Sequence, residues 1–148
     1  MAEISREQIE ALFGRWRVAI DHRDFSAMRD MLTPDARGGN AVFGVFEGRE
    51  SVLDFAESKW PKAVPNDSVW YAIDGSRLVN KWKETLPGDS PSGGPYEYFG
   101  ISEFLYDESD RWRFMYGLPD VPGLMRAHAR WKADGFAAKY PDVYPEMA

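Results

Sequence analysis

Residues 77–86, RLVNKWKETL, and residues 96–106, YEYFGISEFLY, decide the fold, because both runs alternate in residue type from one position to the next. Alternation with a period of two is typical of β-strands. Comparable runs at 68–74 and 111–117, separated by turn-forming residues, extend the pattern. The sequence therefore predicts four long antiparallel strands that form a curved meander in the second half of the chain.

Helical signals dominate the first half of the chain. Residues 5–8, SREQ, fit the capping box that begins a helix, and apolar residues repeat at helical spacing as far as Ile20. A second short helix is predicted after Asp24, with Leu32 on its inner face and Pro34 at its end. Helices before a meander of strands indicate an α+β fold.

Three further segments complete the expected organisation. Gly38-Gly39-Asn40 predicts a turn that leads into a strand over 41–46. A third helix is predicted over about 49–60, where Pro61 stops it. A last helix is predicted over 122–139, and the tail 141–148 is expected to be loose.

Composition excludes several classes of function. The 148 residues carry 18 Lys+Arg against 24 Asp+Glu, a net charge of −6 that disfavours nucleic-acid binding. There is no cysteine and there are only two histidines, His22 and His128, so neither a disulfide nor a Cys-type or three-His metal site is expected. No apolar run is long enough to span a membrane, and we expect a soluble, cytoplasmic protein without a membrane partner.

The order of these elements resembles the nuclear-transport-factor-2-like (NTF2-like, or SnoaL-like) superfamily. The resemblance covers about residues 5–118 and rests on three stretches, WRVAIDHRDF at 16–25, MLTPDAR at 31–37 and FGVFEGRESV at 43–52. It implies an α+β cone, in which a curved antiparallel sheet wraps round the N-terminal helices and leaves a cavity at its open end. We expect one domain over 1–148, with residues 119–148 as an extra C-terminal helical extension.

The active sites known in similar enzymes of this superfamily can be compared with the residues of this sequence. Similar ketosteroid-isomerase-like enzymes use a carboxylate base on the first strand, where the best match here is Asn40, an amide that cannot take a proton. Scytalone-dehydratase-like sites need histidines on strands, and none is expected on a strand here. Limonene-epoxide-hydrolase-like sites and Asp-based polyketide cyclases need aspartates on the sheet, and the interiors of the expected strands contain none.

Strand alternation then selects candidate site residues. Lys81 and Lys83 suit water, which turns Asn80, Trp82 and Glu84 toward the cavity, although a slip of one residue would bring Lys81 inside instead. The candidate catalytic residues are Glu84, Tyr96, Tyr98 and His128, because they are the remaining proton donors and acceptors. The candidate substrate-binding residues are Trp16, Asn40, Asn80, Lys81, Trp82, Ser102, Phe104, Phe114 and Tyr116.

Each candidate also has a purely structural interpretation. Glu84 suits either a general acid–base with a raised pKa beside Trp82 or a carboxylate at the cavity rim. Tyr96 and Tyr98 suit either hydrogen bonding to a ligand or filling of the core. Asn40 suits either a ligand hydroxyl or turn formation, and His128 lies on the C-terminal helix, which is placed to cover the cavity mouth.

The functional hypothesis is a cofactor-independent lyase or dehydratase that acts on a hydrophobic aromatic small molecule. The 6 Trp, 7 Tyr and 9 Phe favour such a ligand, and the sequence has no phosphate-binding loop and no metal-ligand cluster. One branch of the similar superfamily, the lignin-dimer γ-formaldehyde lyases, eliminates a benzylic hydroxyl to form a quinone methide. The alternatives are a non-catalytic small-molecule-binding protein and a polyketide cyclase, hydrolase or isomerase with atypical residues. The resemblance further implies a homodimer or higher homo-oligomer, in which association through the outer sheet face would cover Phe99, Ile101 and Leu105.

Overall fold

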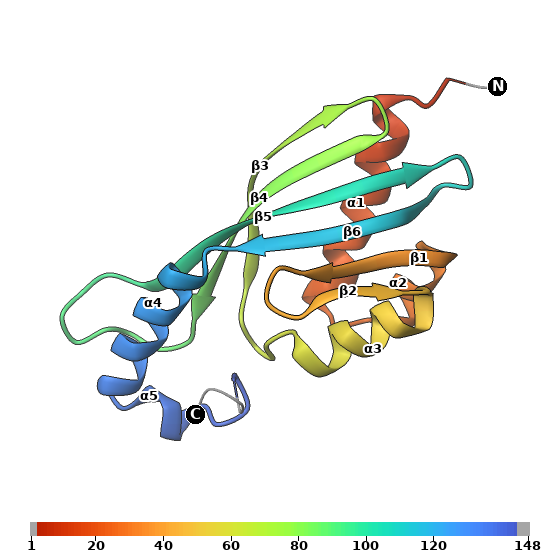
Figure 1. Cartoon of the computed structure of the whole chain (residues 1–148). Coiled ribbons are helices and arrows are strands. Elements are labelled where there is room, and N and C mark those ends of the chain that lie inside the picture. Colours follow the sequence, from red (N-terminus) through yellow and green to blue (C-terminus); the bar gives the residue numbers. More distant parts are fainter. Residues whose placement is uncertain (1–2, 145–148) are drawn as a thin grey trace.

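The computed structural model describes residues 3–144, which form a strongly bent sheet with helices packed against it (Figure 1). The helices are α1 (Arg6–Asp21), α2 (Phe25–Asp30), α3 (Arg49–Lys59), α4 (Val121–Ala133) and α5 (Phe136–Lys139). The strands are β1 (Leu32–Asn40), β2 (Gly44–Glu47), β3 (Asn66–Asp74), β4 (Arg77–Leu86), β5 (Tyr96–Asp107) and β6 (Arg111–Pro119). None of the helices in this range is long and apolar enough to cross a membrane.

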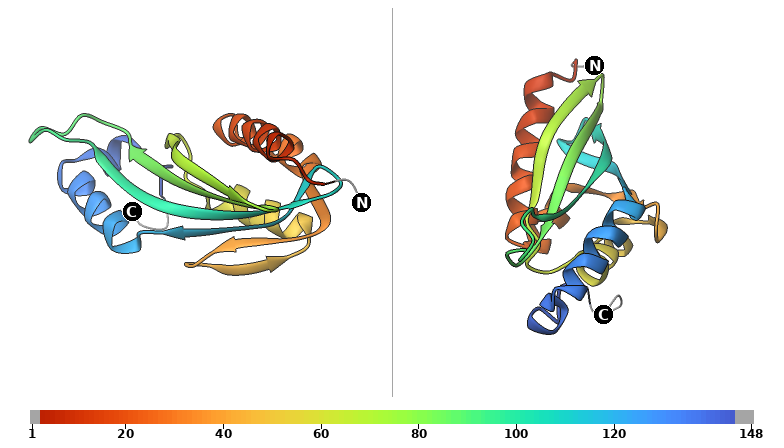
Figure 2. Two further views of the ribbon diagram at one scale, coloured as in Figure 1. Left: turned by 90° about the horizontal axis from the view of Figure 1, so that it is seen from above. Right: turned by 90° about the vertical axis from the view of Figure 1, so that its left-hand side faces the viewer.

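The sheet has the order β2-β1-β6-β5-β4-β3. Strands β3 to β6 form the antiparallel meander expected from the sequence, whereas β1 pairs with β6 in parallel. The two further views show the long curve of β4, β5 and β6, with α1 lying along one face (Figure 2). The architecture is the expected α+β cone, and the sheet is not closed into a barrel.

Helix α1 lies on the concave face of the sheet and forms the main core with it. Ser5 caps the helix through the predicted capping box, in which its hydroxyl accepts from the Gln8 N–H and the Gln8 side chain accepts from the Ser5 N–H. The buried face of α1 includes Leu12, Phe13 and Trp16, which pack against Phe104 of β5 and its neighbours. Burying aromatic and aliphatic side chains of this size is the main favourable term that holds helix and sheet together.

The prediction for residues 31–46 is wrong in detail. Helix α2 ends at Asp30, and Leu32 to Asn40 form strand β1 instead of a helix end and a turn. The turn lies at 41–43, and β2 begins only at Gly44. Pairing with β6 overrides the local residue preferences for a turn here. Strand β1 runs beside β6 with Gly38 opposite Met115, and the two backbones are so close that a Cβ on Gly38 would lie 2.8 Å from the Met115 carbonyl oxygen.

Strand β6 also departs from strict alternation. Tyr106 pairs with Trp112, but the next partner of β5, Leu105, pairs with Phe114, so one residue of β6 is left over as a β-bulge. The bulge turns Trp112 and Met115 toward the core and leaves Phe114 and Tyr116 on the other face. The expectation that these last two aromatic residues line the cavity is therefore wrong.

The C-terminal extension folds back onto the end of the β4–β5 hairpin. The helix predicted over 122–139 is interrupted by Asp134 and Gly135, the latter in a left-handed conformation with φ 89°, which separates α4 from α5. Val143 and Tyr144 are buried, so this part of the tail is not loose; residues 145–148 of the predicted tail lie outside the described residues. A satellite core joins the extension to the sheet and contains Leu86, Tyr96, Trp131, Val143 and Tyr144.

Candidate functional site

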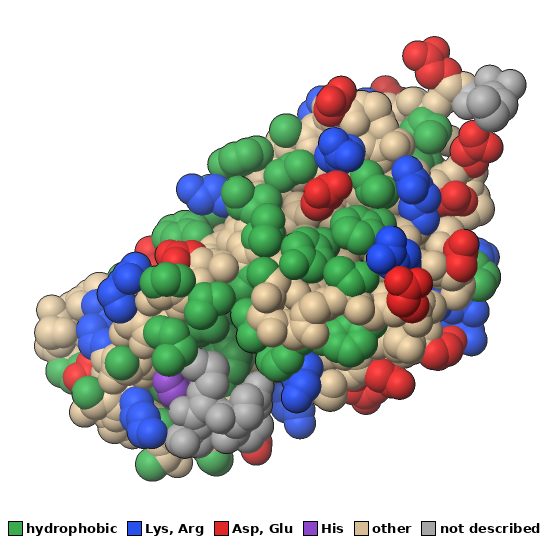
Figure 3. Space-filling model, in the orientation of Figure 1, with side chains coloured by type: hydrophobic (Ala, Val, Ile, Leu, Met, Phe, Trp, Pro, Cys, Tyr) green, Lys and Arg blue, Asp and Glu red, His purple; other side chains and the backbone are tan. Residues whose placement is uncertain are grey.

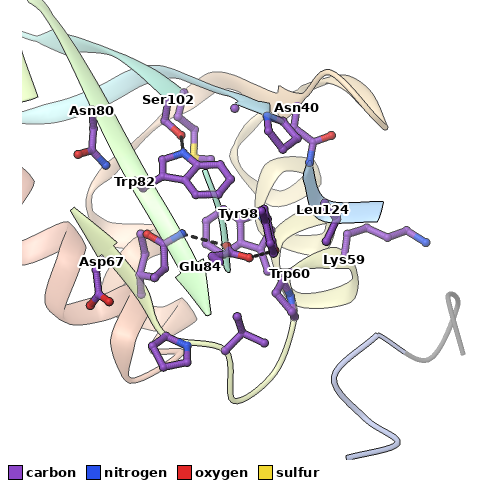
Figure 4. Close-up of a pocket in the computed structure, with 18 of the residues that line it drawn as sticks. Asn40, Lys59, Trp60, Asp67, Asn80, Trp82, Glu84, Tyr98, Ser102 and Leu124 are labelled. Atoms are coloured by element: carbon purple, nitrogen blue, oxygen red, sulfur yellow. Dashed lines mark hydrogen bonds between the residues drawn. The ribbon is translucent and has the colours of Figure 1, made fainter. Parts of the chain in front are cut away.

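A cavity of about 680 Å³ opens between the C-terminal half of α1, the loop 60–65 and the concave face of the sheet. Its walls come from segments far apart in the sequence, including β4, β5, β6 and the start of α4 (Figure 4). A volume in this range suits a small organic ligand. The apolar part of the wall comprises Trp16, Ile20, Val42, Phe43, Trp60, Val64, Trp82, Phe104, Met115, Leu124 and several prolines.

Most of the candidate residues on the sheet lie on this wall. Asn80, Trp82 and Glu84 of β4 face the cavity together with Tyr98, Ser102 and Phe104 of β5, and Trp16 and Asn40 join them from α1 and β1. The register agrees with the expected alternation, because Lys81 lies outside, with its ammonium group 5.1 Å from the centre of the Phe99 ring. Lys83 likewise pairs with Glu97 on the outer face at 3.5 Å.

Four candidates besides Lys81 lie away from the cavity. Phe114 and Tyr116 stack on each other on the outer face of the sheet. Tyr96 is fully buried in the satellite core, where its hydroxyl donates to the Asp134 carboxylate at the end of α4. His128 is buried between Trp131 and Tyr144 and does not contribute to the cavity wall.

Glu84 is the centre of the polar part of the wall. Its Oε2 accepts hydrogen bonds from the hydroxyls of Tyr98 and, at 3.3 Å, of Tyr144, and these two hydroxyls also contact each other. Its Oε1 accepts from Nδ2 of Asn66 at 2.9 Å. The carboxyl group is thus held from three segments of the chain, β3, β5 and the C-terminal tail.

Burial determines the acid–base character of this group. Desolvation raises the pKa of Glu84 above its ordinary value, and hydrogen bonds from Tyr98, Asn66 and Tyr144, with the charge of Arg17, oppose the rise only in part. The pKa of Tyr98 is also raised, first by desolvation and then by the negative charge of Glu84. Tyr98 therefore remains a hydroxyl and a hydrogen-bond donor at neutral pH, while Glu84 is poised to exchange a proton.

Arg17 supports this corner from α1. Its guanidinium donates to the side chain of Asn66 at 2.6 Å and to the Asn66 backbone carbonyl, which fixes the amide that binds Glu84. Burial lowers the pKa of Arg17, and the nearby charges of Asp21, Asp67 and Glu84 raise it. The cavity therefore holds a positively charged group as well as carboxylates, within a mostly apolar enclosure.

Asp67 corrects one expectation about the strands. Strand β3 begins at Asn66, two residues earlier than predicted, and so contains Asp67, which lines the cavity. Strand interiors therefore do hold aspartate. The nearby arginine, Arg17, comes from a helix, so the Asp-Arg-Asp arrangement on the sheet, which the family resemblance would require, is not reproduced by these two residues.

The remaining polar groups serve packing as well as lining. Trp82 donates from Nε1 to the Ser102 hydroxyl at 2.8 Å, and its ring meets the Tyr98 ring edge-on at 6.2 Å. Asn80 is hydrogen-bonded to Ser68 at 2.6 Å. Asn40 ends β1 and caps the turn at 41–43, because its Oδ1 accepts from the backbone N–H groups of Val42 and Phe43.

Sequence reasoning missed several residues of this site, among them Arg17, Asn66, Asp67 and Tyr144. Arg17 follows Trp16 on the buried side of an amphipathic helix, which is a weak signal for a charged group near a cavity. Asn66 precedes the run at 68–74 that predicts a strand, and Tyr144 lies in the tail that the sequence predicts to be loose. Within residues 3–144 no group of three or more His, Cys, Asp or Glu side chains gathers closely enough to hold a metal ion.

No protein-family model and no curated protein matches the sequence. Solved structures do match the fold: an LEH-like epoxide hydrolase from M. tuberculosis superposes with a TM-score of 0.68 at 14% identity over 91% of this chain and 97% of the other. An NTF2-like protein of unknown function from Burkholderia pseudomallei superposes with a TM-score of 0.66 at 14% identity over 84% and 98%. The chain has the NTF2-like fold.

A third structure with the NTF2-like fold is named as a SnoaL-like polyketide cyclase from Jannaschia sp. CCS1. It superposes with a TM-score of 0.69 at 16% identity over 86% of this chain and 96% of the other. Proteins with this NTF2-like fold thus bear the names of different enzyme classes, and function must be argued from the site itself.

Proposed function

We propose that this chain is a cofactor-independent lyase or dehydratase that acts on a hydrophobic aromatic alcohol by proton transfer and elimination. The observation that carries the proposal is the buried Glu84 carboxyl group, which lies on the wall of a mostly apolar cavity and is hydrogen-bonded by Tyr98. Glu84 and Tyr98 are the proposed catalytic residues. Trp16, Trp82 and Phe104 are the proposed contacts of the aromatic part of the substrate.

The proposed step starts from an aryl alcohol with a hydroxyl group para to the reacting carbon. The benzylic C–O bond breaks, and the hydroxyl group leaves as water with a proton from Glu84. The phenolic O–H loses its proton to solvent at the cavity mouth, and the electron pair flows into the ring to give a quinone methide. A carboxyl group with a raised pKa suits this role, because it keeps its proton to a higher pH than an ordinary carboxyl group and becomes a base after the step.

Catalysis explains Glu84 better than passive binding does. A protein that only binds an apolar ligand gains nothing from a desolvated carboxyl group, because keeping that group in an apolar wall costs free energy. Groups with strongly perturbed pKa values in clefts are characteristic of active sites. Non-catalytic binding is the outcome that the following experiment distinguishes.

The test is a screen of para-hydroxylated and para-methoxylated aryl alcohols, with products identified by mass spectrometry. We expect loss of water, alone or with a second bond cleavage, from the free phenols only, since the methyl ethers cannot form the quinone methide. Glu84→Gln should abolish the reaction and retain binding. Tight binding of the phenols by the unaltered protein without any product would instead identify it as a binding protein.

We also propose that two copies of the chain associate through the outer face of the sheet. Apolar side chains are exposed there on neighbouring strands, with Phe99 37%, Ile101 41% and Leu118 53% exposed. In Figure 3 apolar side chains are spread over this face, with charged groups among them. Light scattering should give the mass of a dimer, and Ile101→Lys should shift it to the mass of a monomer.

A further inference from the structure

The C-terminal extension contributes one polar group to the cavity. Helix α4 and the tail lie outside the α1–sheet core, yet Leu124 and Tyr144 reach the cavity wall. Tyr144 is 8% exposed, and its hydroxyl lies within hydrogen-bond distance of both Glu84 and Tyr98. The extension therefore meets the site at the two groups to which we assign the chemistry.

The C-terminal extension is held in place by contacts of α4 and α5 with the end of the β4–β5 hairpin. Trp131 donates from Nε1 to the Pro87 carbonyl at 2.7 Å, and Arg130 donates to the Pro95 carbonyl at 2.6 Å. Phe136 packs over Gly88, where an added Cβ would lie 2.6 Å from the ring. The Tyr96 hydroxyl donates to the Asp134 carboxylate, so the extension packs on the end of the β4–β5 hairpin.

We propose that Tyr144 is a positioning residue of the site, which the C-terminal extension brings in to hold the Glu84 carboxyl group between its own hydroxyl and that of Tyr98. This inference rests on the proposed function only for its catalytic consequence. Without Tyr144, Oε2 of Glu84 keeps the Tyr98 hydrogen bond alone, and the carboxyl group gains freedom to turn away from the substrate. A hydroxyl that donates to a carboxylate also stabilises its charged form.

Charged and titratable groups from several elements surround Glu84 and Tyr144. Arg17 on α1 and Asn66 on β3 act on Glu84 from one side, with Asp67 near Arg17, and Tyr98 on β5 binds it from the other. His128 on α4 meets the ring of Tyr144, 6.1 Å between centres, on the side of the extension. Replacement of Tyr144 by Phe retains the ring and these neighbours, and removes only the hydroxyl.

The test compares Tyr144→Phe with Tyr140→Phe, a matched change on the same tail at a ring that stacks on Trp131 and does not line the cavity. The titration of Glu84 is followed by carboxyl ¹³C NMR, with its resonance assigned by its absence in Glu84→Gln. In Tyr144→Phe the titration should move up by about one pH unit, since one hydrogen bond to a charged group is lost. In Tyr140→Phe it should not move.

The titration needs no substrate, so its result is independent of the aryl alcohol screen. An unchanged Glu84 titration in folded Tyr144→Phe would overturn the inference, even with an active enzyme. If the enzyme is active, the alkaline limb of kcat/KM, where the proton-donating Glu84 loses its proton, should move in the same direction as the NMR titration, with a loss in kcat of about tenfold. A fall in kcat with no movement of that limb or of the titration would assign Tyr144 a packing role only.

Discussion

The hydroxyl of Tyr98 donates a hydrogen bond to Oε2 of Glu84 across neighbouring strands, where the two residues are paired directly in the antiparallel register of β4 and β5. Both side chains therefore point into the cavity from adjacent positions of one sheet face. The pair joins Glu84, a carboxyl group with a raised pKa, to Tyr98, which stays a hydroxyl at neutral pH.

Removal of either partner should suppress turnover. We expect Tyr98→Phe and Glu84→Gln to lower kcat by about 10²–10⁴-fold, the usual contribution of a positioned acid–base group. Steady-state kinetics on the aryl alcohol identified by the screen measures this effect. Tyr116→Phe on the outer sheet face is the matched control and should stay within about threefold; a loss under threefold in both site variants would move the active site elsewhere.

The raised pKa of Glu84 should make stability depend on pH in a specific direction. Between the unfolded value of about 4.5 and the higher folded value, the folded chain binds more protons than the unfolded chain. The contribution of Glu84 to the free energy of unfolding therefore falls as pH rises through this window. Urea unfolding of the native protein and of Glu84→Gln over pH 4 to 8 measures it as a difference, and a difference that is constant with pH would contradict the raised pKa.

Tyr96→Phe should affect turnover much less than Tyr98→Phe does, although the sequence predicted both tyrosines as catalytic residues. The Tyr96 hydroxyl binds Asp134 in the satellite core and does not line the cavity, so kcat should change by less than about threefold. Loosening of the C-terminal extension should appear as faster amide exchange in α4, measured by hydrogen exchange. A large loss of kcat with normal exchange in α4 would return Tyr96 to the catalytic group.

Gly100 should be intolerant of even one added methyl group. An added Cβ would lie 2.1 Å from the Trp82 ring, so Gly100→Ala must displace the indole and weaken its hydrogen bond to Ser102. We expect a loss of about 1–3 kcal/mol in the free energy of unfolding and a shifted indole N–H resonance. Gly14→Ala, on the exposed side of α1 with no atom within 4 Å of the new Cβ, should instead stabilise by about 0.5–1 kcal/mol.

Activity should not depend on a metal ion. The chain has no cysteine, and within residues 3–144 no three His, Asp or Glu side chains gather closely enough to hold a metal ion. We expect full turnover after exhaustive dialysis against EDTA. Loss of turnover that a single divalent ion restores would disprove the proposed elimination by protein groups alone.

Several features of the site follow directly from the residue pattern. The capping box before Arg6 and the apolar repeat that includes Trp16 predicted α1 and its buried face. Alternation along β4 predicted that Trp82 and Glu84 lie on the inner face and Lys81 on the outer one. These predictions hold because a regular helix or strand fixes the direction of each side chain from its position alone.

Other features depended on contacts that no local pattern contains. Residues 32–40 form a strand because β6 lies beside them, and a bulge in β6 turned Phe114 and Tyr116 away from the cavity. Tyr96 and Tyr98 share one strand face, yet the bend of the sheet assigns one to the satellite core and the other to the cavity.

The sequence by itself determined the α+β class, the capped first helix, the inner and outer faces of β4 and the absence of cysteine chemistry. The tertiary structure alone decided that Arg17, Asn66 and Tyr144 meet around Glu84. The physical reason is one of range. Periodicity and capping act over a few residues, whereas the hydrogen bonds to Glu84 join positions 14 to 60 residues apart, brought together only by burial of the core and of the C-terminal extension.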